Sequence, residues 1–171
     1  MTKMAFPQQG SLFSDSLLAE HQNYYPDISF VKADDQEVRF AVDFKTTYRN
    51  PSKPYLCNGF TLGSHGKYFE ERTSTKNIQF PYAEYTSHIC LGILYTRALS
   101  IDIDETKILQ LNELDKITSV IKNLVFFAEE KWKISSDKGG SGNTANIGSI
   151  QYIDDILKGN GVFKNLGEKV F

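Results

Sequence analysis

Two aspartates and a lysine near the start of the chain have the residue types of a metal-binding site. Asp27 follows a proline, and Asp43 and Lys45 lie further along with a single residue between them. Carboxylates that lie close together repel each other unless a proton or a cation is placed between them. Mg²⁺ prefers oxygen ligands and is commonly held by one or two carboxylates together with substrate phosphates. Asp27 and Asp43 are therefore candidate metal ligands, and all three residues are candidate catalytic groups.

The residues between the two aspartates are predicted to form a β-hairpin. Apolar side chains alternate at Ile28 and Phe30 and again over residues 38–44, which is the period of two typical of half-buried strands. The polar run 33–36 between these segments predicts the turn.

The register of this hairpin decides whether the aspartates meet. A turn centred on Asp35 sets Ile28 opposite Val42, so that the apolar residues of both strands share one face. The same register sets Asp27 opposite Asp43 on the other face, where cross-strand Cβ atoms lie roughly 4.5–5.5 Å apart. The alternative is an ordinary hairpin with solvated charges, because Asp-x-Lys alone is a common tripeptide.

Longer segments of the sequence favour the catalytic interpretation. Pro-Asp followed by Asp-x-Lys is the signature of the PD-(D/E)xK nuclease superfamily, and the chain resembles the EcoRV-type type II restriction endonucleases within it. The resemblance extends over residues 20–165, and a glycine-rich run at 140–150 is its most specific part. The similar segments occur in the same order as in that family: Gln22–Asp27, Asp43–Tyr48, Phe60–Gly63, Thr75–Ile78, Tyr95–Arg97, Leu111–Leu114, Lys131–Trp132 and Gly140–Ile150.

The resemblance implies an α/β fold of the PD-(D/E)xK restriction-endonuclease type, with a mixed β-sheet flanked by helices. We expect a single domain over residues 1–171, in which the C-terminal subdomain of the family is missing. Residues 1–20 are weakly patterned and have no clear counterpart in the longer N-terminal region of the family. Their apolar residues, which include Phe13 and Leu17, are compatible with a short amphipathic helix.

The function implied by the resemblance is Mg²⁺-dependent hydrolysis of double-stranded DNA by a type II restriction endonuclease. A cytoplasmic homodimer that cuts a short palindrome in a restriction-modification system is expected, with GATATC as the first target to test. Asp27 and Asp43 would hold the metal, and Lys45 would complete the catalytic set. The alternative is a shortened, catalytically silent DNA-binding homologue. A repair or mobile-element nuclease with another target is disfavoured by the similarity at 140–150.

The resemblance also implies DNA contacts in four parts of the chain. Gln22 and Asn23 would approach the minor groove, where amide side chains offer both a donor and an acceptor. Lys76 lies in a polar segment suited to phosphate contacts. A glycine-rich loop would enter the major groove and read the bases. The remaining candidates are Thr46 and Thr47, beside the catalytic lysine, and Gly140, Ser141, Gly142, Asn143 and Thr144 in the loop.

Composition limits the other classes of protein. The 171 residues include 40% hydrophobic residues, which is enough for the core of one domain. The formal net charge of −2 does not by itself indicate a nucleic-acid partner, so DNA contacts must come from local clusters of residues. No apolar run is long enough to cross a membrane, and no signal peptide is predicted. Cys57 and Cys90 lack metal spacing and are expected to be reduced thiols.

The rest of the chain predicts further elements of the sheet. We expect a short strand over 60–66, a short helix after Pro81, a buried central strand over 88–99, an edge strand within 101–123 and a core strand over 124–128. Residues 129–133 suggest a charged turn or helix. The run 139–144 contains three glycines and is expected to be a loop rather than part of a strand. A helix over 150–157 is expected to follow it, capped by Ser149 and ended by Gly159.

Overall fold

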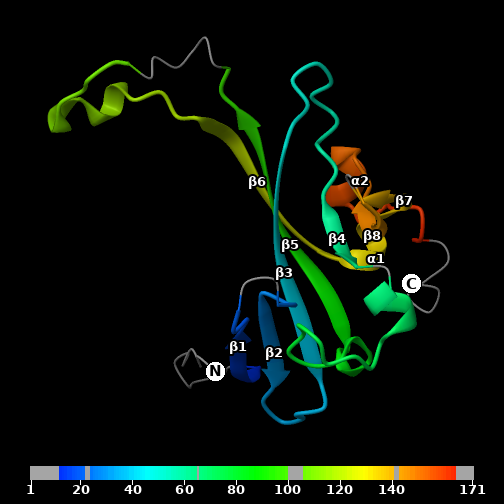
Figure 1. The fold of residues 1–171 in the computed structure, drawn as a ribbon. Helices are drawn as coiled ribbons and strands as arrows, with labels where there is room; N and C mark the ends of the chain where they lie inside the picture. The colour runs from blue at the N-terminus through cyan, green and yellow to red at the C-terminus, as the bar shows by residue number, and fades with distance from the viewer. Residues whose placement is uncertain (1–11, 22–23, 65, 100–105, 141–142, 165–171) are drawn as a thin grey trace.

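Two β-sheets organise the protein, as seen in the computed structural model (Figure 1), which describes residues 12–21, 24–64, 66–99, 106–140 and 143–164. The larger sheet has the strand order β1-β2-β3-β5-β6, and the smaller has the order β4-β8-β7. The pair β3 and β5 is parallel and the other pairs are antiparallel, which confirms the expected mixed sheet. The strands are β1 (Phe13–Leu18), β2 (Ile28–Lys32), β3 (Arg39–Tyr48), β4 (Thr61–Ser64), β5 (Ser87–Arg97), β6 (Ile121–Glu130), β7 (Ser135–Gly140) and β8 (Asn143–Ser149).

Helices are few and short in the described part of the chain. The two α-helices are α1 (Lys131–Ile134) and α2 (Ile153–Leu157), and Gly66–Glu70 (η1) forms a π-helical turn. The short helix expected after Pro81 is the 3-10 helix Tyr82–Glu84 (η2), and a second 3-10 helix spans Leu111–Lys116 (η4). None of the described helices is long and apolar enough to span a membrane.

The predicted hairpin is confirmed, including its register. Strands β2 and β3 are antiparallel, with Ile28 paired to Val42 and Phe30 paired to Phe40. Between the strands, the backbone N–H of Val38 donates to the carbonyl oxygen of Asp35. The turn is therefore where the polar run places it.

The polar face of the hairpin is the more deeply buried of its two faces. Ser29 and Ala41 are fully buried, and Asp43 is only 6% exposed. The parallel partner β5 continues this face with Cys90 and Leu94, which belong to the same buried cluster as Ala41. Asp43 therefore lies against the core of the protein rather than on a solvated surface.

Strand β1 replaces the helix that was expected near the N-terminus. Residues 13–18 pair antiparallel with β2, and Leu17 lies opposite Ser29. The ring of Phe13 packs against Phe30 and Phe40, so the apolar row of the hairpin gains a partner that a strand presents well. Tertiary pairing decided the structure of this weakly patterned segment. Residues 1–11, where part of that helix was expected, lie outside the described part of the chain.

Strand β5 lies between β3 and β6, as predicted, but it is buried on alternate residues rather than throughout. Strand β6 is longer than the predicted core strand and forms an edge of the sheet. Phe127 is its only residue classed as buried. We expected an edge strand within 101–123, and this prediction is wrong for residues 106–120, which contain η4 and no strand. Residues 100–105 lie outside the described part of the chain.

The glycine-rich run corrects another expectation. Gly139 and Gly140 belong to β7, and Asn143 begins β8, so the run forms the end of a β-hairpin. Strand β8 also pairs with β4, which satisfies the backbone groups of residues 146–148 in a sheet. The following helix is accordingly shorter than predicted and begins after Tyr152.

Ser149 therefore ends a strand and does not cap a helix. Its Oγ accepts a hydrogen bond from the backbone N–H of Phe60 at 3.0 Å. The predicted end of α2 is confirmed, because Gly159 has a φ of +59° directly after the helix, a conformation that favours glycine.

Candidate active site

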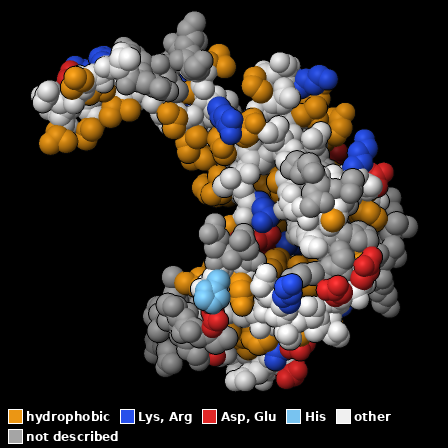
Figure 2. Space-filling view, viewed as in Figure 1, with side chains coloured by type: hydrophobic (Ala, Val, Ile, Leu, Met, Phe, Trp, Pro, Cys, Tyr) orange, Lys and Arg blue, Asp and Glu red, His pale blue; other side chains and the backbone are white. Residues whose placement is uncertain are grey.

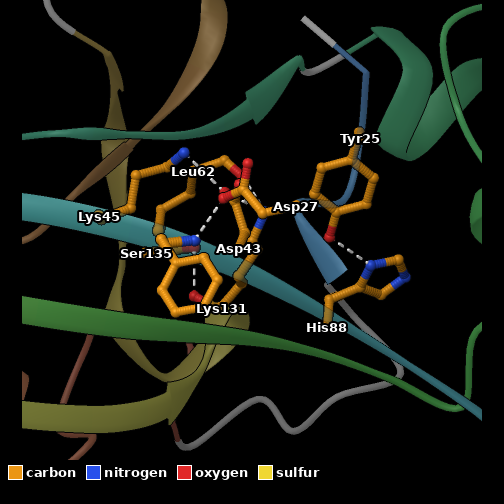
Figure 3. A network of polar contacts seen from close by, with 9 residues as sticks. Tyr25, Asp27, Asp43, Lys45, Leu62, His88, Lys131 and Ser135 are labelled. Atoms are coloured by element: carbon orange, nitrogen blue, oxygen red, sulfur yellow. Dashed lines mark hydrogen bonds and ion pairs between the residues drawn. The ribbon is translucent and has the colours of Figure 1, made fainter. Parts of the chain in front are cut away.

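The hairpin brings the two predicted metal ligands together at one end of β2. Asp27 directly precedes β2, and Asp43 lies in the middle of β3 (Figure 3). The backbone N–H of Phe44 donates to Oδ2 of Asp27 at 2.6 Å, which fixes the Asp27 carboxylate beside the catalytic strand. The side chain of Lys45 lies on the same side of β3 as Asp43, and its Nζ is 2.8 Å from Oδ2 of Asp43. The sequence-predicted catalytic set is therefore assembled in the folded chain.

A second lysine completes this cluster, and sequence reasoning missed it. Lys131 is the first residue of α1, and its Nζ lies 3.0 Å from Oδ2 of Asp43. The run 129–133 was expected to be a charged turn or helix, and α1 begins within it, but the side chain of Lys131 is only 1% exposed. The only sequence signal was the resemblance of Lys131-Trp132 to the family, which gave no role to the lysine.

The ionisation of the two carboxylates differs because their neighbours differ. Burial raises the pKa of Asp27, and the nearby Asp43 carboxylate adds to this, while the Phe44 N–H opposes it. Burial also acts to raise the pKa of Asp43, but the ammonium groups of Lys131 and Lys45 outweigh it and hold that pKa below its ordinary value. Asp43 is therefore the carboxylate that stays charged most readily.

The buried lysine is affected in the opposite sense. Burial lowers the pKa of Lys131, and the Asp43 carboxylate resists this by favouring the charged form. His88 packs beside this group, with its Nδ1 2.7 Å from the hydroxyl of Tyr25. Burial, aided by the charge of Lys131, lowers the pKa of His88 to about 3, so the ring is neutral at neutral pH. His88 is therefore a packed, neutral histidine.

A cavity of about 420 Å³ opens onto the carboxylates. Residues from the larger sheet, from β4 and from the segment before β2 share its wall. This arrangement brings the two sheets together around one polar space. The lining residues are Tyr24, Tyr25, Asp27, Asp43, Lys45, Thr61, Gly63, Ser64, Asn77, Ile78 and Tyr82.

The donor set fits a hard divalent cation that shares its ligands with a substrate. Among the residues that the structure describes, no group of three or more His, Cys, Asp or Glu side chains is arranged to hold a metal. Mg²⁺ needs fewer protein ligands than that, because waters and substrate phosphates commonly fill most of its six positions. The carboxylates of Asp27 and Asp43 would supply the protein oxygens. The chemistry of the site therefore matches Mg²⁺ better than Zn²⁺, which prefers nitrogen and sulfur.

The predicted DNA-contacting residues fall into three groups in the structure. Thr46 is exposed, whereas Thr47 is buried and its hydroxyl donates to the carbonyl oxygen of Asn58 at 2.6 Å. Lys76 is exposed and directly precedes Asn77, which lines the cavity. Gly140 pairs with Asn143 across the β7–β8 hairpin, and Thr144 follows in β8.

Four further candidates lie outside the described residues: Gln22, Asn23, Ser141 and Gly142. Of their described neighbours, one belongs to the wall of the cavity and another lies one strand away from it. Tyr24 lines it directly. Strand β8 reaches it through β4, because Ser64 of β4 lines the cavity and pairs with Asn146.

Comparison with known proteins agrees with this geometry. A family model described as restriction endonuclease EcoRV matches residues 9–171. The type II restriction enzyme EcoRV of Escherichia coli is 37% identical to this chain over 150 residues, which cover 87% of the chain. The same residues cover 59% of the Escherichia coli enzyme, so the chain spans less than two thirds of the length of that relative. The match over nearly the whole chain shows that it belongs to the EcoRV family of restriction endonucleases.

Proposed function

We propose that this protein is a Mg²⁺-dependent type II endonuclease that hydrolyses DNA phosphodiesters at a short palindromic site. The observation that carries the proposal is the convergence of Asp27, Asp43 and Lys45 on one cavity. Two carboxylates and a lysine at this spacing can hold a divalent cation and a phosphate side by side. The family supports the same reaction class.

The protein side chains have distinct roles in this proposal. Asp27 and Asp43 bind the cation, and the Phe44 N–H keeps the Asp27 carboxylate oriented towards it. Lys45 carries a positive charge at the edge of the cavity, where it orients the attacking water and stabilises the phosphate oxygens. Mg²⁺, when bound, supplies Lewis-acid stabilisation of the charge that develops on the phosphate.

DNA recognition is proposed to come from the segments that flank the cavity. Gly140 at the end of β7 is paired with Asn143 of β8, and small residues here would allow the backbone to approach the base edges. Gln22 and Asn23 would approach from the other side, next to the cavity residue Tyr24. Thr46 and Lys76 are exposed and would contact the sugar-phosphate backbone. Thr47 would act by positioning Thr46, since its own hydroxyl is bound to Asn58.

A homodimer is proposed because a palindromic site calls for two-fold symmetry in the protein. The surface that supports this is an arm, which we define as the described residues 98–99 and 106–120. It projects away from the two sheets (Figure 1), and hydrophobic side chains gather along the side that faces the hollow beneath it (Figure 2). Apolar side chains gathered on one exposed surface mark a site of association, and a second copy would cover them. The exposed hydrophobic residues of the described arm are Leu99, Ile108, Leu111, Leu114, Ile117 and Val120.

Cleavage of a plasmid that carries GATATC tests the proposal. Incubation with Mg²⁺ should give blunt linear product, and EDTA or the substitution Asp43→Ala should abolish it. A folded protein that binds the site without cutting it would instead be a catalytically silent DNA-binding homologue. Cleavage at a different sequence would retain the nuclease and reject the target. In the cell, we propose that the enzyme acts in the cytoplasm as part of a restriction-modification system.

A further inference from the structure

Lys131 is a charged side chain in a place where charge is costly. Its side chain is only 1% exposed, and removing an ammonium group from water is unfavourable unless it is well paired. Its Nζ donates to the carbonyl oxygen of Leu62 at 2.5 Å and to Oδ2 of Asp43 at 3.0 Å. It also lies 4.2 Å from the centre of the Tyr25 ring. These contacts surround the ammonium group on several sides.

The contacts join three separate elements around the cavity. Asp43 belongs to β3, Leu62 belongs to β4, and Tyr25 belongs to the segment that leads to Asp27. The position of Lys131 is itself fixed, because the hydroxyl of Ser135 donates to its carbonyl oxygen at 2.6 Å. Figure 3 shows the ammonium group directed into the network from beneath the catalytic strand.

Both lysines of the site contact the same oxygen of Asp43. Lys45 Nζ is 2.8 Å and Lys131 Nζ is 3.0 Å from Oδ2. The Lys45 side chain is 27% exposed, so it has room to turn towards a water or a phosphate. Lys131 is enclosed and has no such freedom. The contact between Lys131 Nζ and Oδ2 of Asp43 is therefore the more constant of the two.

We propose that Lys131 is a positioning residue that retains Oδ2 of Asp43, so that this carboxylate offers only Oδ1 to a divalent cation in the cavity. The proposal deepens the proposed nuclease function, since it concerns the cation which that function requires. Lys131 also sets the charge of the site: with Asp27, Asp43 and Lys45 the four formal charges cancel before any cation binds. A phosphate would therefore be needed to make the cavity strongly attractive to Mg²⁺.

Removal of the ammonium group should have two effects of opposite direction. Cation binding should become stronger, because a positive charge is lost beside the ligand and both oxygens of Asp43 become available. Cleavage should become slower, because the carboxylate is no longer held in one orientation and the reacting groups lose their alignment. A lysine that served only for folding would weaken both properties together.

The experiment measures Mn²⁺ binding to the whole chain without DNA by isothermal titration calorimetry, beside single-turnover DNA cleavage in saturating Mg²⁺. The variants are Lys131→Met, which removes the charge at similar length, and Lys131→Gln, which keeps a donor for Leu62. Lys133→Met is the matched control, because Lys133 lies in the same helix but pairs with Glu130 at the surface. Circular dichroism monitors the folding of each variant.

We expect both Lys131 variants to bind Mn²⁺ about tenfold more tightly than the unmodified protein, since one unit charge is removed at hydrogen-bonding distance. Cleavage should slow by about tenfold or more, and the Lys133 control should change neither property. Weaker or unchanged Mn²⁺ binding in a folded variant would overturn the proposal. Loss of folding in both variants would also overturn it, in favour of a purely structural lysine.

The same data separate this proposal from the proposed function. If the unmodified protein cuts no DNA while its Mn²⁺ affinity still rises on loss of Lys131, the nuclease proposal fails and the positioning role stands. If cleavage occurs and the affinity does not rise, the positioning role fails and the nuclease stands. Absence of Mn²⁺ binding in every form, the Lys131 variants included, would contradict the positioning role, and absence of DNA cleavage as well would contradict the nuclease.

Discussion

The two faces of the five-stranded sheet are organised in opposite ways. One face carries Asp43, Lys45 and His88 in a buried or partly buried polar network. The other carries apolar side chains that remain exposed, among them Phe44 and Phe126, which is 67% exposed. Along β3, Asp43 is therefore enclosed whereas its neighbour Phe44 is 45% exposed.

The comparison shows that charged groups of the site are buried together with the apolar core. Burying Asp43 and Lys131 is unfavourable unless each charge is paired, and the structure pairs them with each other. Such a network gives fixed orientation to the groups that would hold a phosphate in the proposed reaction. The exposed apolar face lies beside the arm and has the character of an association surface. The predictions below test this contrast.

The largest expected effect is on catalysis at the polar face. Lys45→Met should reduce the rate of DNA cleavage by about 10²–10⁴-fold, because the positioned ammonium group is lost from the reacting centre. Binding to the same DNA should persist, since the substitution leaves the β7–β8 hairpin unchanged. Lys32→Met is a matched control, because Lys32 lies at the surface with Asp34. Single-turnover cleavage and a DNA-binding titration measure the two properties; equal rates in both variants would contradict the role of Lys45.

Adjacent phenylalanines of β6 compare the two faces directly. Phe127 is 7% exposed and packs over Gly92, so Phe127→Ala should lower the free energy of unfolding by about 3–5 kcal/mol. Phe126→Ala should change it by less than about 0.5 kcal/mol at low protein concentration. Urea denaturation measures both values. Phe126→Ala should instead weaken self-association in sedimentation experiments, and equal destabilisation by the two variants would refute the contrast.

The neutral His88 should make stability depend on pH. Its pKa is about 3 in the folded protein, against an ordinary value of 6.5. The unfolded chain therefore binds more protons between these values, and the free energy of unfolding falls as pH decreases from 6.5, by up to about 1.4 kcal/mol per pH unit. Denaturation at pH 6.5 and 5 should show a smaller fall for His88→Gln. The carboxylates titrate in both proteins and contribute equally to each fall. If the free energy of unfolding fell by the same amount in both proteins, the burial of a neutral His88 ring would be contradicted.

The smallest effect concerns the threonines that follow Lys45. Thr47→Val removes a buried hydrogen bond to Asn58 and should cost about 1 kcal/mol of unfolding free energy. Thr46→Val should leave stability unchanged and weaken DNA binding, because Thr46 is exposed. Thermal denaturation and a DNA titration of the two variants provide the comparison. The reverse assignment, with Thr47→Val affecting only DNA binding, would show that its hydroxyl leaves Asn58 in the complex.

The hairpin of β2 and β3 could be predicted from the sequence because the pattern that specifies it lies within one short segment. Alternation over residues 28–44 and a polar turn fix the register, and the register alone sets Asp27 beside Asp43. Strand β1 was missed because its short segment lacks strong alternation and is determined by pairing with β2. The hairpin of β7 and β8 was missed because glycine-rich residues disfavour strands unless distant partners, here β4, complete the sheet.

The sequence predicted only those site residues that lie close together along the chain. Asp27, Asp43 and Lys45 lie within one hairpin, whereas Lys131 reaches Asp43 from a distant part of the chain. In sequence it stands among glutamates and lysines, the usual composition of a solvated turn. Only the packing of α1 against the sheets reveals that this one lysine is enclosed. The buried face was also unpredictable, because hydrophobicity alone favours the opposite face.

A crystal structure grown in Mn²⁺, with anomalous diffraction at the manganese absorption edge, would locate the metal site directly. We expect an anomalous peak in the cavity, with carboxylate oxygens of Asp27 and Asp43 about 2.0–2.3 Å away, distances typical of small divalent cations with oxygen ligands. The same crystal of the Asp43→Asn variant should lose the peak. A well-occupied peak elsewhere, in a protein whose DNA cleavage depends on the metal, would contradict the central claim that these two aspartates form the catalytic metal site.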